Sequence, residues 1–200
     1  MAKLILYYAH PGQRFSRVNH AMTDAVREIE GITRVDLYAD YPRYDINVEH
    51  EQERLIDHDV IVWQFPLFWY SVPALLKDWM DLVLEPGFAY GDGGDKLEGK
   101  RVMLAISTGG PEESYCKDGY NNFDLRTLLA PLEQTARLCK MEFLPPYVFY
   151  GAVGADGEAR VADHAASYRQ LIEALRDDRF DPQDIEVLTS KVFTGQEAAE

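Results

Sequence analysis

Apolar positions along the chain form short, nearly continuous runs that are separated by longer segments with helical spacing. The run at residues 3–9 suits a strand that is buried on both faces, as in a parallel sheet. The segment 16–30 carries apolar residues at helical spacing and predicts a helix, with Ser16 as its N-cap. The rest of the chain predicts strands at 33–39, 59–65, 101–107 and 141–151, and helices before residue 58 and at 71–84, 123–140 and 159–178.

The order of these elements predicts the fold class. Strands that alternate with helices indicate βαβ units and a parallel sheet. Five such units suit a doubly wound α/β fold of flavodoxin type, with a five-stranded parallel sheet of order 2-1-3-4-5 and helices on both faces. We expect Pro131 to interrupt its helix, and Pro145 and Pro146 to make the fifth strand irregular. One domain is predicted over residues 1–178, and the tail 179–200 is expected to be loosely docked or disordered.

Charge and composition narrow the functional classes. The formal net charge of -14 argues against a nucleic-acid binder and against docking on anionic lipid. No apolar run approaches the roughly 18 residues of a membrane span, so we expect no membrane insertion. Two cysteines without CxxC spacing make a reducing cytoplasm the default location. The five histidines form no HExxH motif and no cluster, and we expect no metal site.

Three loops of unusual composition follow the first, third and fourth strands. In open α/β sheets, ligands bind at the carboxyl ends of strands near the point where the strand order reverses, and these loops meet there. The first loop leads into a helix N-terminus, where free N–H groups favour phosphate. Ser16 and Asn19 add hydrogen bonds, Arg17 a charge and His10 a donor, although an ordinary βα turn with a capping serine explains the same residues. Neither a P-loop nor a GxGxxG motif is present.

The second loop contains four aromatic residues within six positions: Phe65, Phe68, Trp69 and Tyr70. They form either unusually dense core or a wall against a flat ligand, and we favour the wall. An isoalloxazine ring needs such apolar contact, and the N–H groups of Trp69 and Tyr70 could reach its polar edge. In the third loop, Ser107 and Thr108 precede Gly109 and Gly110, which let backbone donors approach a ligand closely. Tyr115 could add a hydroxyl, whereas two glycines after a strand often form only a turn.

Several long motifs resemble one known family. They are YYAHPGQRFSRVN, VWQFPLFWYSVPALLKDWMDLVLEPGFAYGDGG, ISTGGPEESY, YADYPRYDINVEHEQERL and LEQTARLCKMEFLPPYVFYG. Over residues 3–176 the chain resembles the flavodoxin-like NAD(P)H:quinone oxidoreductases, and in particular the ancillary oxidoreductases of glutathione-regulated potassium efflux systems. The resemblance implies a homodimer with two shared sites and a non-covalent FMN, or FAD as in some relatives.

The resemblance also implies roles for individual residues. His10 and Ser16, Arg17, Val18 and Asn19 would hold the flavin phosphate. The isoalloxazine would lie on Leu67, Phe68, Trp69 and Tyr70, next to Pro66. Its pyrimidine side would face Ser107, Thr108, Gly109 and Gly110, and Tyr115 matches the active-site tyrosine. Mammalian-type members carry a histidine six residues past that tyrosine, where this chain has Asn121.

The predicted function is two-electron, ping-pong transfer of a hydride from NAD(P)H through flavin N5 to a quinone. Two alternatives stay open at this point. The first is a regulatory subunit that acts mainly on a potassium efflux antiporter, which would hold it at the inner face of the membrane. The second is an electron-transfer flavodoxin, which would stabilise a one-electron semiquinone.

Overall fold

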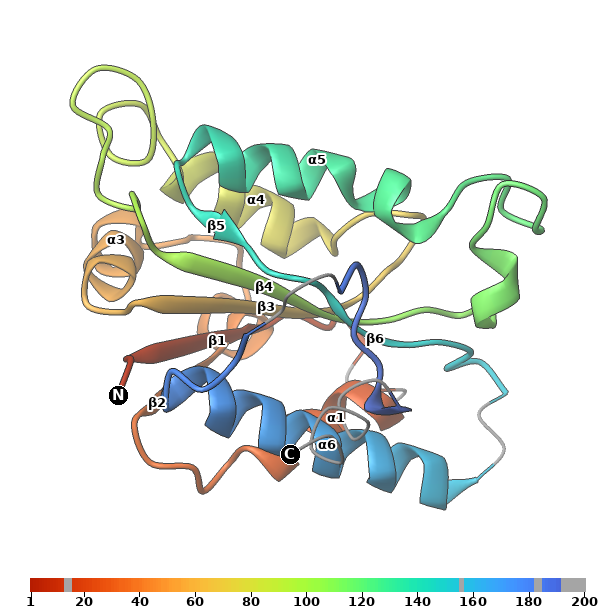
Figure 1. The fold of residues 1–200 in the computed structure, drawn as a ribbon. Coiled ribbons are helices and arrows are strands. Elements are labelled where there is room, and N and C mark those ends of the chain that lie inside the picture. The colour runs from red at the N-terminus through yellow and green to blue at the C-terminus, as the bar shows by residue number, and fades with distance from the viewer. Residues whose placement is uncertain (13–15, 155–156, 182–184, 192–200) are drawn as a thin grey trace.

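A six-stranded parallel sheet forms the centre of the protein (Figure 1). The computed structural model describes residues 1–12, 16–154, 157–181 and 185–191. The strand order is β2-β1-β3-β4-β5, and β6 pairs with β4, so the predicted flavodoxin-like fold and strand order are confirmed. The strands are β1 Leu4–Tyr8, β2 Ile32–Asp36, β3 Val60–Pro66, β4 Arg101–Ser107, β5 Glu142–Phe143 and β6 Tyr147–Phe149.

Helices cover both faces of the sheet, as expected (Figure 1). One face carries α1 (Arg17–Ala25) and α6 (Glu158–Arg176), and the other carries α3 (Val48–Ile56), α4 (Ala74–Val83) and α5 (Leu125–Leu138). Each face has its own apolar cluster. Every residue of β1 and β3 is buried, because helices pack on both sides of these central strands. Short helical turns at α2 (Leu37–Asp40) and η2 (Glu112–Ser114) complete the described helices.

Three local predictions need correction. Residues 37–39 were predicted as strand but belong to α2, because the Asp36 carboxylate accepts hydrogen bonds from the N–H groups of Tyr38 and Ala39 and so caps a helix. Pro131 does not interrupt α5, which continues through it with buried residues on either side. The fifth strand is two strands, β5 and β6, since the two prolines between them cannot donate to a neighbouring strand.

The segment after α6 returns to the sheet. Leu188 is fully buried, its N–H donates to the Pro146 carbonyl over 2.9 Å, and its carbonyl accepts from Val148 over 2.9 Å. Residues 185–191 therefore lie along β6 over part of the predicted tail. The remaining tail residues, 192–200, lie outside the described residues.

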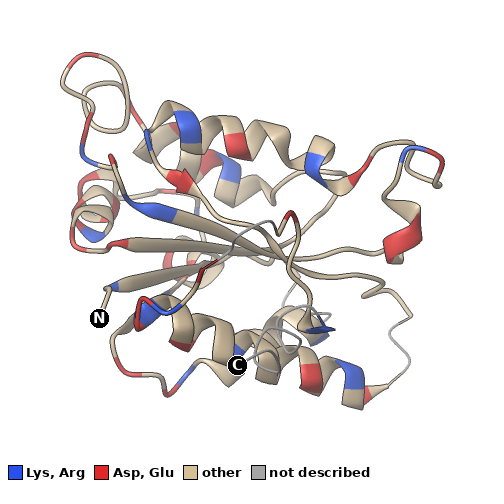
Figure 2. Ribbon diagram, in the orientation of Figure 1, with Lys and Arg blue, Asp and Glu red and all other residues tan. Residues whose placement is uncertain are grey.

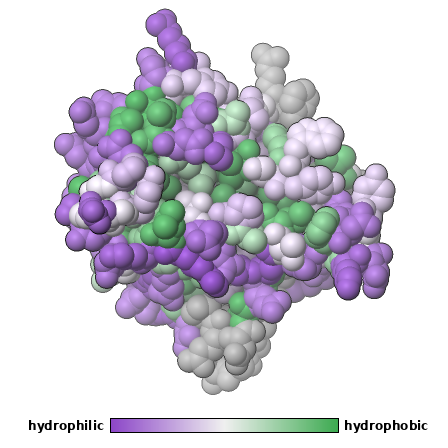
Figure 3. All heavy atoms as spheres, turned by 90° about the horizontal axis from the view of Figure 1, so that it is seen from above, coloured by the Kyte–Doolittle hydropathy of each residue, from purple (hydrophilic) through white to green (hydrophobic). Residues whose placement is uncertain are grey.

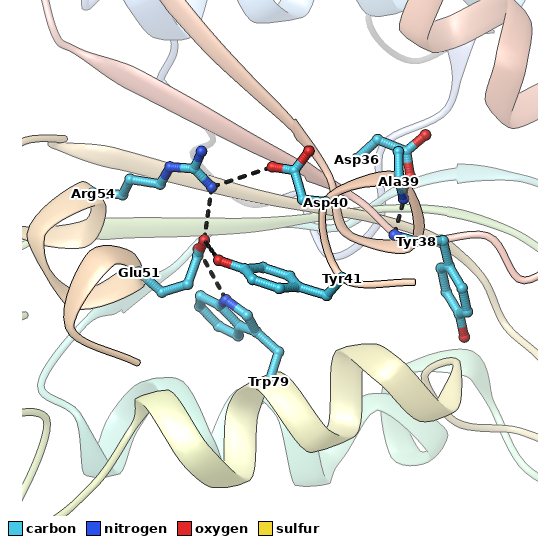
Figure 4. A network of polar contacts seen from close by, with 8 residues as sticks. All are labelled: Asp36, Tyr38, Ala39, Asp40, Tyr41, Glu51, Arg54 and Trp79. Atoms are coloured by element: carbon cyan, nitrogen blue, oxygen red, sulfur yellow. Dashed lines mark hydrogen bonds and ion pairs between the residues drawn. The ribbon is translucent and has the colours of Figure 1, made fainter. Parts of the chain in front are cut away.

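A buried carboxylate ties the helices of the α3 and α4 face together (Figure 4). Glu51 of α3 is fully buried and accepts hydrogen bonds from the Tyr41 hydroxyl (2.5 Å) and the Trp79 indole N–H (3.1 Å). The Arg54 guanidinium pairs with the same carboxylate at 2.7 Å and reaches Asp40 at 3.5 Å. Because a charge buried without partners is costly, these donors make Glu51 an anchor between α3 and α4.

Charged side chains lie mostly on the helices and loops that surround the sheet (Figure 2). Seen from above, the face over α4 and α5 is mainly hydrophilic but contains several apolar patches (Figure 3). Among the described residues, no helix combines the length and apolar character needed to cross a membrane.

Candidate flavin site

A cavity of about 790 Å³ lies where the loops after β1, β3, β4 and β6 meet. This volume is within the range of about 300–1,000 Å³ that is usual for ligand pockets. The described residues that line it are His10, Ser16, Arg17, Val18, Asn19, Pro66, Leu67, Phe68, Trp69, Ser107, Thr108, Gly109, Ala152 and Val153. Arg17 is the one residue of fixed charge among them. The described lining of this acidic chain therefore contains no carboxylate, which suits an anionic ligand.

The structure brings together most of the predicted site residues but not all of them. Tyr70, Gly110 and Tyr115 are absent from the described lining. Phe65, which we assigned to the aromatic wall, is fully buried within β3 and packs in the core, because β3 pairs with β4 along its whole length, from Val60 to Pro66. Ala152 and Val153 line the cavity and were missed. Their apolar character gives no signal in the sequence, and only the pairing of β6 with β4 brings them there.

In the part of the chain that the structure describes, the first N–H groups of α1 have no hydrogen-bond partner, and their residues line the cavity. Ser16 occupies the N-cap position, but its side chain makes no capping hydrogen bond. Its hydroxyl instead lies 2.9 Å from the hydroxyl of the buried Tyr8. No backbone partner is found within the described residues for the N–H groups of Arg17, Val18 and Asn19, and the first turn holds no acidic residue. These N–H groups and the positive end of the helix dipole could hold a phosphate.

His10 lies at the base of the same loop as a neutral donor. Its Nδ1 accepts a hydrogen bond from the Gly12 N–H at 3.1 Å, so the neutral ring carries its proton on Nε2. Burial lowers the pKa of His10, which favours this neutral form at pH 7. The ring makes an edge contact with the Phe68 ring, with the ring centroids 5.7 Å apart, and so connects the first loop to the second.

Asn19 and Ser107 form a buried polar pair in the lining. The Asn19 Nδ2 donates to the Ser107 Oγ at 2.7 Å, and their exposed fractions are 2% and 5%. The Asn19 Oδ1 is buried without a partner in the described part of the chain. Because a buried acceptor without a partner is costly, this atom fits a ligand donor such as a hydroxyl of the flavin ribityl chain.

The second loop has a strained backbone. Trp69 and Tyr70 have φ values of +49° and +62°, in the left-handed region that non-glycine residues seldom adopt. Such strain is found disproportionately at functional sites. The Phe68 N–H donates to the Pro66 carbonyl, whereas the N–H groups of Trp69 and Tyr70 have no hydrogen-bond acceptor among the described residues. Trp69 is 90% exposed, so the second loop offers an aromatic surface and two free donors.

The third loop is held from both ends. The Thr108 N–H donates to the Phe149 carbonyl at 2.9 Å, and the Thr108 carbonyl accepts from Ala152 at 2.8 Å. Gly109 and Gly110 do not have positive φ values, and a Cβ on Gly109 would meet Val153 at an ordinary 3.6 Å. The local backbone conformation therefore does not require glycine at these two positions. A ligand that approaches the backbone closely would require it.

Tyr70 and Tyr115, two predicted site residues that are absent from the described lining, contact neighbouring loops. Tyr115 packs against Tyr150 with ring centroids 5.8 Å apart. The Tyr70 hydroxyl donates to the Asn121 side-chain oxygen at 3.2 Å, which connects the loop after β3 to the loop that contains Tyr115. Within the described residues, no group of three His, Cys, Asp or Glu side chains could hold a metal ion.

Comparison with known proteins places the chain in one fold family, although the names of its relatives differ in the activity they give. A family model described as "flavodoxin-like fold" matches residues 2–172. The glutathione-regulated potassium-efflux system ancillary protein KefG of Cronobacter sakazakii is 44% identical over 86% of this chain and 92% of its own length.

Solved structures include general stress protein 14 of Treponema denticola in complex with FMN (36% identity, TM-score 0.79, 89% and 99% of the two chains). An NADPH-quinone reductase of P. pentosaceus is 30% identical, with a TM-score of 0.72 over 84% of this chain and 96% of its own. A protein of S. violaceusniger described as a thermophilic tryptophan halogenase is 46% identical, with a TM-score of 0.80 over 84% and 97%.

Proposed function

We propose that this chain, which belongs to the flavodoxin-like quinone oxidoreductase family and resembles its potassium-efflux ancillary branch, is a flavin-dependent NAD(P)H:quinone oxidoreductase. The observation that supports this most directly is the single cavity that joins unpaired helix N–H groups to an exposed aromatic surface. A phosphate at one end and a flat ring at the other match the shape and chemistry of FMN. FMN needs only this one cavity, so we propose it in preference to FAD.

Each part of the cavity has a proposed role. The first turn of α1, with Arg17 and the Nε2–H of His10, binds the phosphate. Asn19 and Ser107 bind the ribityl chain. Phe68 and Trp69 pack on the ring, and the N–H groups of Trp69 and Tyr70 orient its polar edge.

When bound, a flavin would supply the redox chemistry, a two-electron hydride transfer between NAD(P)H and the quinone. In the balanced reaction, NAD(P)H, a proton and a quinone give NAD(P)+ and the hydroquinone. A single cavity that serves both substrates implies that the oxidised nicotinamide leaves before the quinone enters. Tyr115 is the proposed catalytic residue, and it would donate a hydrogen bond to the quinone oxygen.

We also propose a homodimer and an antiporter partner. Large apolar side chains near the site loops are exposed, among them Tyr120 (88%) and Phe123 (54%), and a second copy would cover such residues. The name of the KefG relative supports an ancillary role on a potassium efflux antiporter. This second function is compatible with catalysis, and it predicts that the protein co-purifies with the antiporter from membranes.

The first test is the visible spectrum of the pure protein, followed by mass spectrometry of the released chromophore. We expect a yellow protein that releases FMN and oxidises NAD(P)H when a quinone is present. A protein that stays colourless after FMN or FAD is added would contradict the proposal. Because the S. violaceusniger relative is named for another reaction, the assay is repeated with tryptophan and chloride, and we expect no halogenated product.

A paired substitution tests the site itself. Asn19→Asp places a carboxylate in a lining that has none, next to the proposed phosphate site, and we expect the Kd for FMN to rise at least about tenfold, or ~1.4 kcal/mol. Asn122→Asp makes the same change at an exposed position outside the lining and should leave the Kd unchanged. Equal affinities for the two variants would remove Asn19 from the site.

A further inference from the structure

Gln64 is a polar residue in an otherwise apolar part of the sheet. It lies in β3 between Trp63 and Phe65, and its side chain is fully buried. Burying an amide without hydrogen-bond partners is costly, so the partners of Gln64 indicate its structural role. Its face of the sheet is the one covered by α1 and α6 (Figure 1), and its partners come from these two helices.

The Gln64 amide connects the strand to the first turn of α1. Its Nε2 donates to the Asn19 carbonyl at 2.7 Å and to the Thr23 Oγ1 at 2.9 Å. The Thr23 hydroxyl donates to the same Asn19 carbonyl at 2.9 Å. Asn19 in turn reaches Ser107 of β4 through its side chain. One amide thereby fixes the main chain of the residue whose side chain lines the cavity.

Tyr168 of α6 fixes the orientation of this amide. Its hydroxyl donates to the Gln64 Oε1 at 3.2 Å and is fully buried. Burial raises the pKa of Tyr168 well above its ordinary value, so the hydroxyl keeps its proton and acts as a donor. The Oε1 atom therefore faces α6, and the Nε2 atom faces α1.

The first turn of α1 needs such an anchor because its N-cap side chain, Ser16, is hydrogen-bonded elsewhere. A capping side chain normally accepts from the first N–H groups and holds the end of a helix in place. Here the Ser16 hydroxyl is paired with Tyr8 and makes no capping hydrogen bond. The N–H groups stay free for a ligand, but the turn loses the restraint that a cap would give.

We propose that Gln64 is a positioning residue for flavin binding, which holds the first turn of α1 against the sheet so that its free N–H groups converge on the phosphate. Tyr168 supports it by keeping the amide in the productive orientation. This inference rests on the proposed function, and it assigns to two residues outside the cavity lining a role in cofactor affinity.

The test compares the binding of FMN and riboflavin, which lacks the phosphate, to the full chain. Gln64→Met keeps the length of the side chain and removes its hydrogen bonds, and we expect the Kd for FMN to rise about tenfold, or ~1.4 kcal/mol. The Kd for riboflavin should change less than about threefold. Tyr168→Phe removes one hydroxyl and should raise the Kd for FMN about threefold, or ~0.7 kcal/mol.

Tyr147→Phe is the matched control. Tyr147 stacks on Tyr168 with centroids 5.5 Å apart and donates a buried hydrogen bond to the His164 carbonyl at 2.9 Å, but it is not among the described hydrogen-bond partners of Gln64 or Asn19. It should lower the melting temperature as Tyr168→Phe does and leave the FMN affinity unchanged.

The outcomes distinguish a failure of the proposed function from a failure of the positioning role of Gln64. If wild-type protein binds neither flavin, the proposed function fails before any variant is compared. If wild type binds FMN but Tyr168→Phe and Tyr147→Phe have equal affinities, and Gln64→Met matches wild type, the positioning role is wrong. An equal rise in both Kd values for Gln64→Met would also contradict it, because the amide would then act on the ring or ribityl part.

Discussion

Trp69 combines two properties that make it a sensitive probe of the site. Its side chain is 90% exposed in the cavity lining, and its backbone has a φ of +49°. A non-glycine residue in this region costs about 1–2 kcal/mol, and an exposed ring contributes little burial energy in return. Asparagine adopts this region more readily, so we expect a Trp69→Asn variant without flavin to be as stable as wild type, or up to about 1 kcal/mol more stable.

Flavin binding should change in the opposite direction. A nucleic-acid base stacked on an aromatic side chain loses about 1–3 kcal/mol of binding free energy when that side chain is truncated. A flavin ring presents a flat face of comparable character. The Kd of Trp69→Asn for FMN should therefore rise about 10- to 100-fold, measured by quenching of flavin fluorescence, while urea unfolding without flavin measures its stability.

Tyr44 provides a matched control for this experiment. It is also an aromatic residue with positive φ (+64°), is 44% exposed, and lies outside the cavity lining. Tyr44→Asn should relieve the same backbone strain and leave the Kd for FMN unchanged. A Trp69→Asn variant that unfolds more easily yet keeps its FMN affinity would show that Trp69 serves the fold and not the flavin.

Three further changes test the packing that supports the site. Burial and the nearby Arg160 charge lower the pKa of His164 to about 3, below the value of 6.5 for the unfolded chain. The neutral ring's contribution is therefore complete above pH 6.5 and is lost as the pH falls toward 3, so between pH 7 and pH 4 urea unfolding should show a loss of about 3 kcal/mol that a His164→Phe variant lacks. Glu51→Ala leaves Arg54 without its buried partner and should lower the free energy of unfolding by about 3–5 kcal/mol in the same assay, whereas the exposed control Glu53→Ala should change it by less than about 0.5 kcal/mol. Leu188→Ala should cost about 2–5 kcal/mol if residues 185–191 pack along β6 in solution, and no change in melting temperature would show that they do not.

The sequence predicts the parts of this fold that depend on local pattern. The fully apolar β1 follows from composition alone, because a strand buried on both faces is mostly apolar, and the polar residues Arg101 and Ser107 mark the two ends of β4. Three of the four loops that line the cavity also follow, since the strand order determines which strand ends meet. What pattern could not supply was the end of β3. Phe65 is an aromatic residue like Phe68 and Trp69, so residue type does not distinguish it from them. Only the pairing of β3 with β4 shows that the Phe65 ring lies in the core.

The polar contacts of the site cannot be predicted from the sequence pattern, for a different reason. Gln64 meets Asn19 and Tyr168 across 45 and 104 residues of sequence, and no local spacing signals such a contact. A glutamine within an apolar strand was visible as an exception, and a buried polar residue needs partners. The positive φ values of Trp69 and Tyr70 carry no signal in residue type either, because glycine or asparagine would be the expected residues there.

The cavity has two ends with different physical character, and this difference explains how binding and turnover could share it. Ser16, Asn19 and Ser107 are at most 5% exposed, and hydrogen bonds to neighbouring elements fix them before any ligand arrives. Trp69 and Val153 are 90% and 84% exposed at the other end. A preorganised polar end loses little entropy on binding and so can retain a cofactor through many cycles. An open apolar end leaves one face of a flat ring accessible, which a pair of substrates that bind in turn requires. Substitutions at the polar end should therefore change the Kd for FMN, whereas substitutions at the exposed end, such as Trp69→Asn, should change the Kd for FMN and also the KM values for the nicotinamide and the quinone.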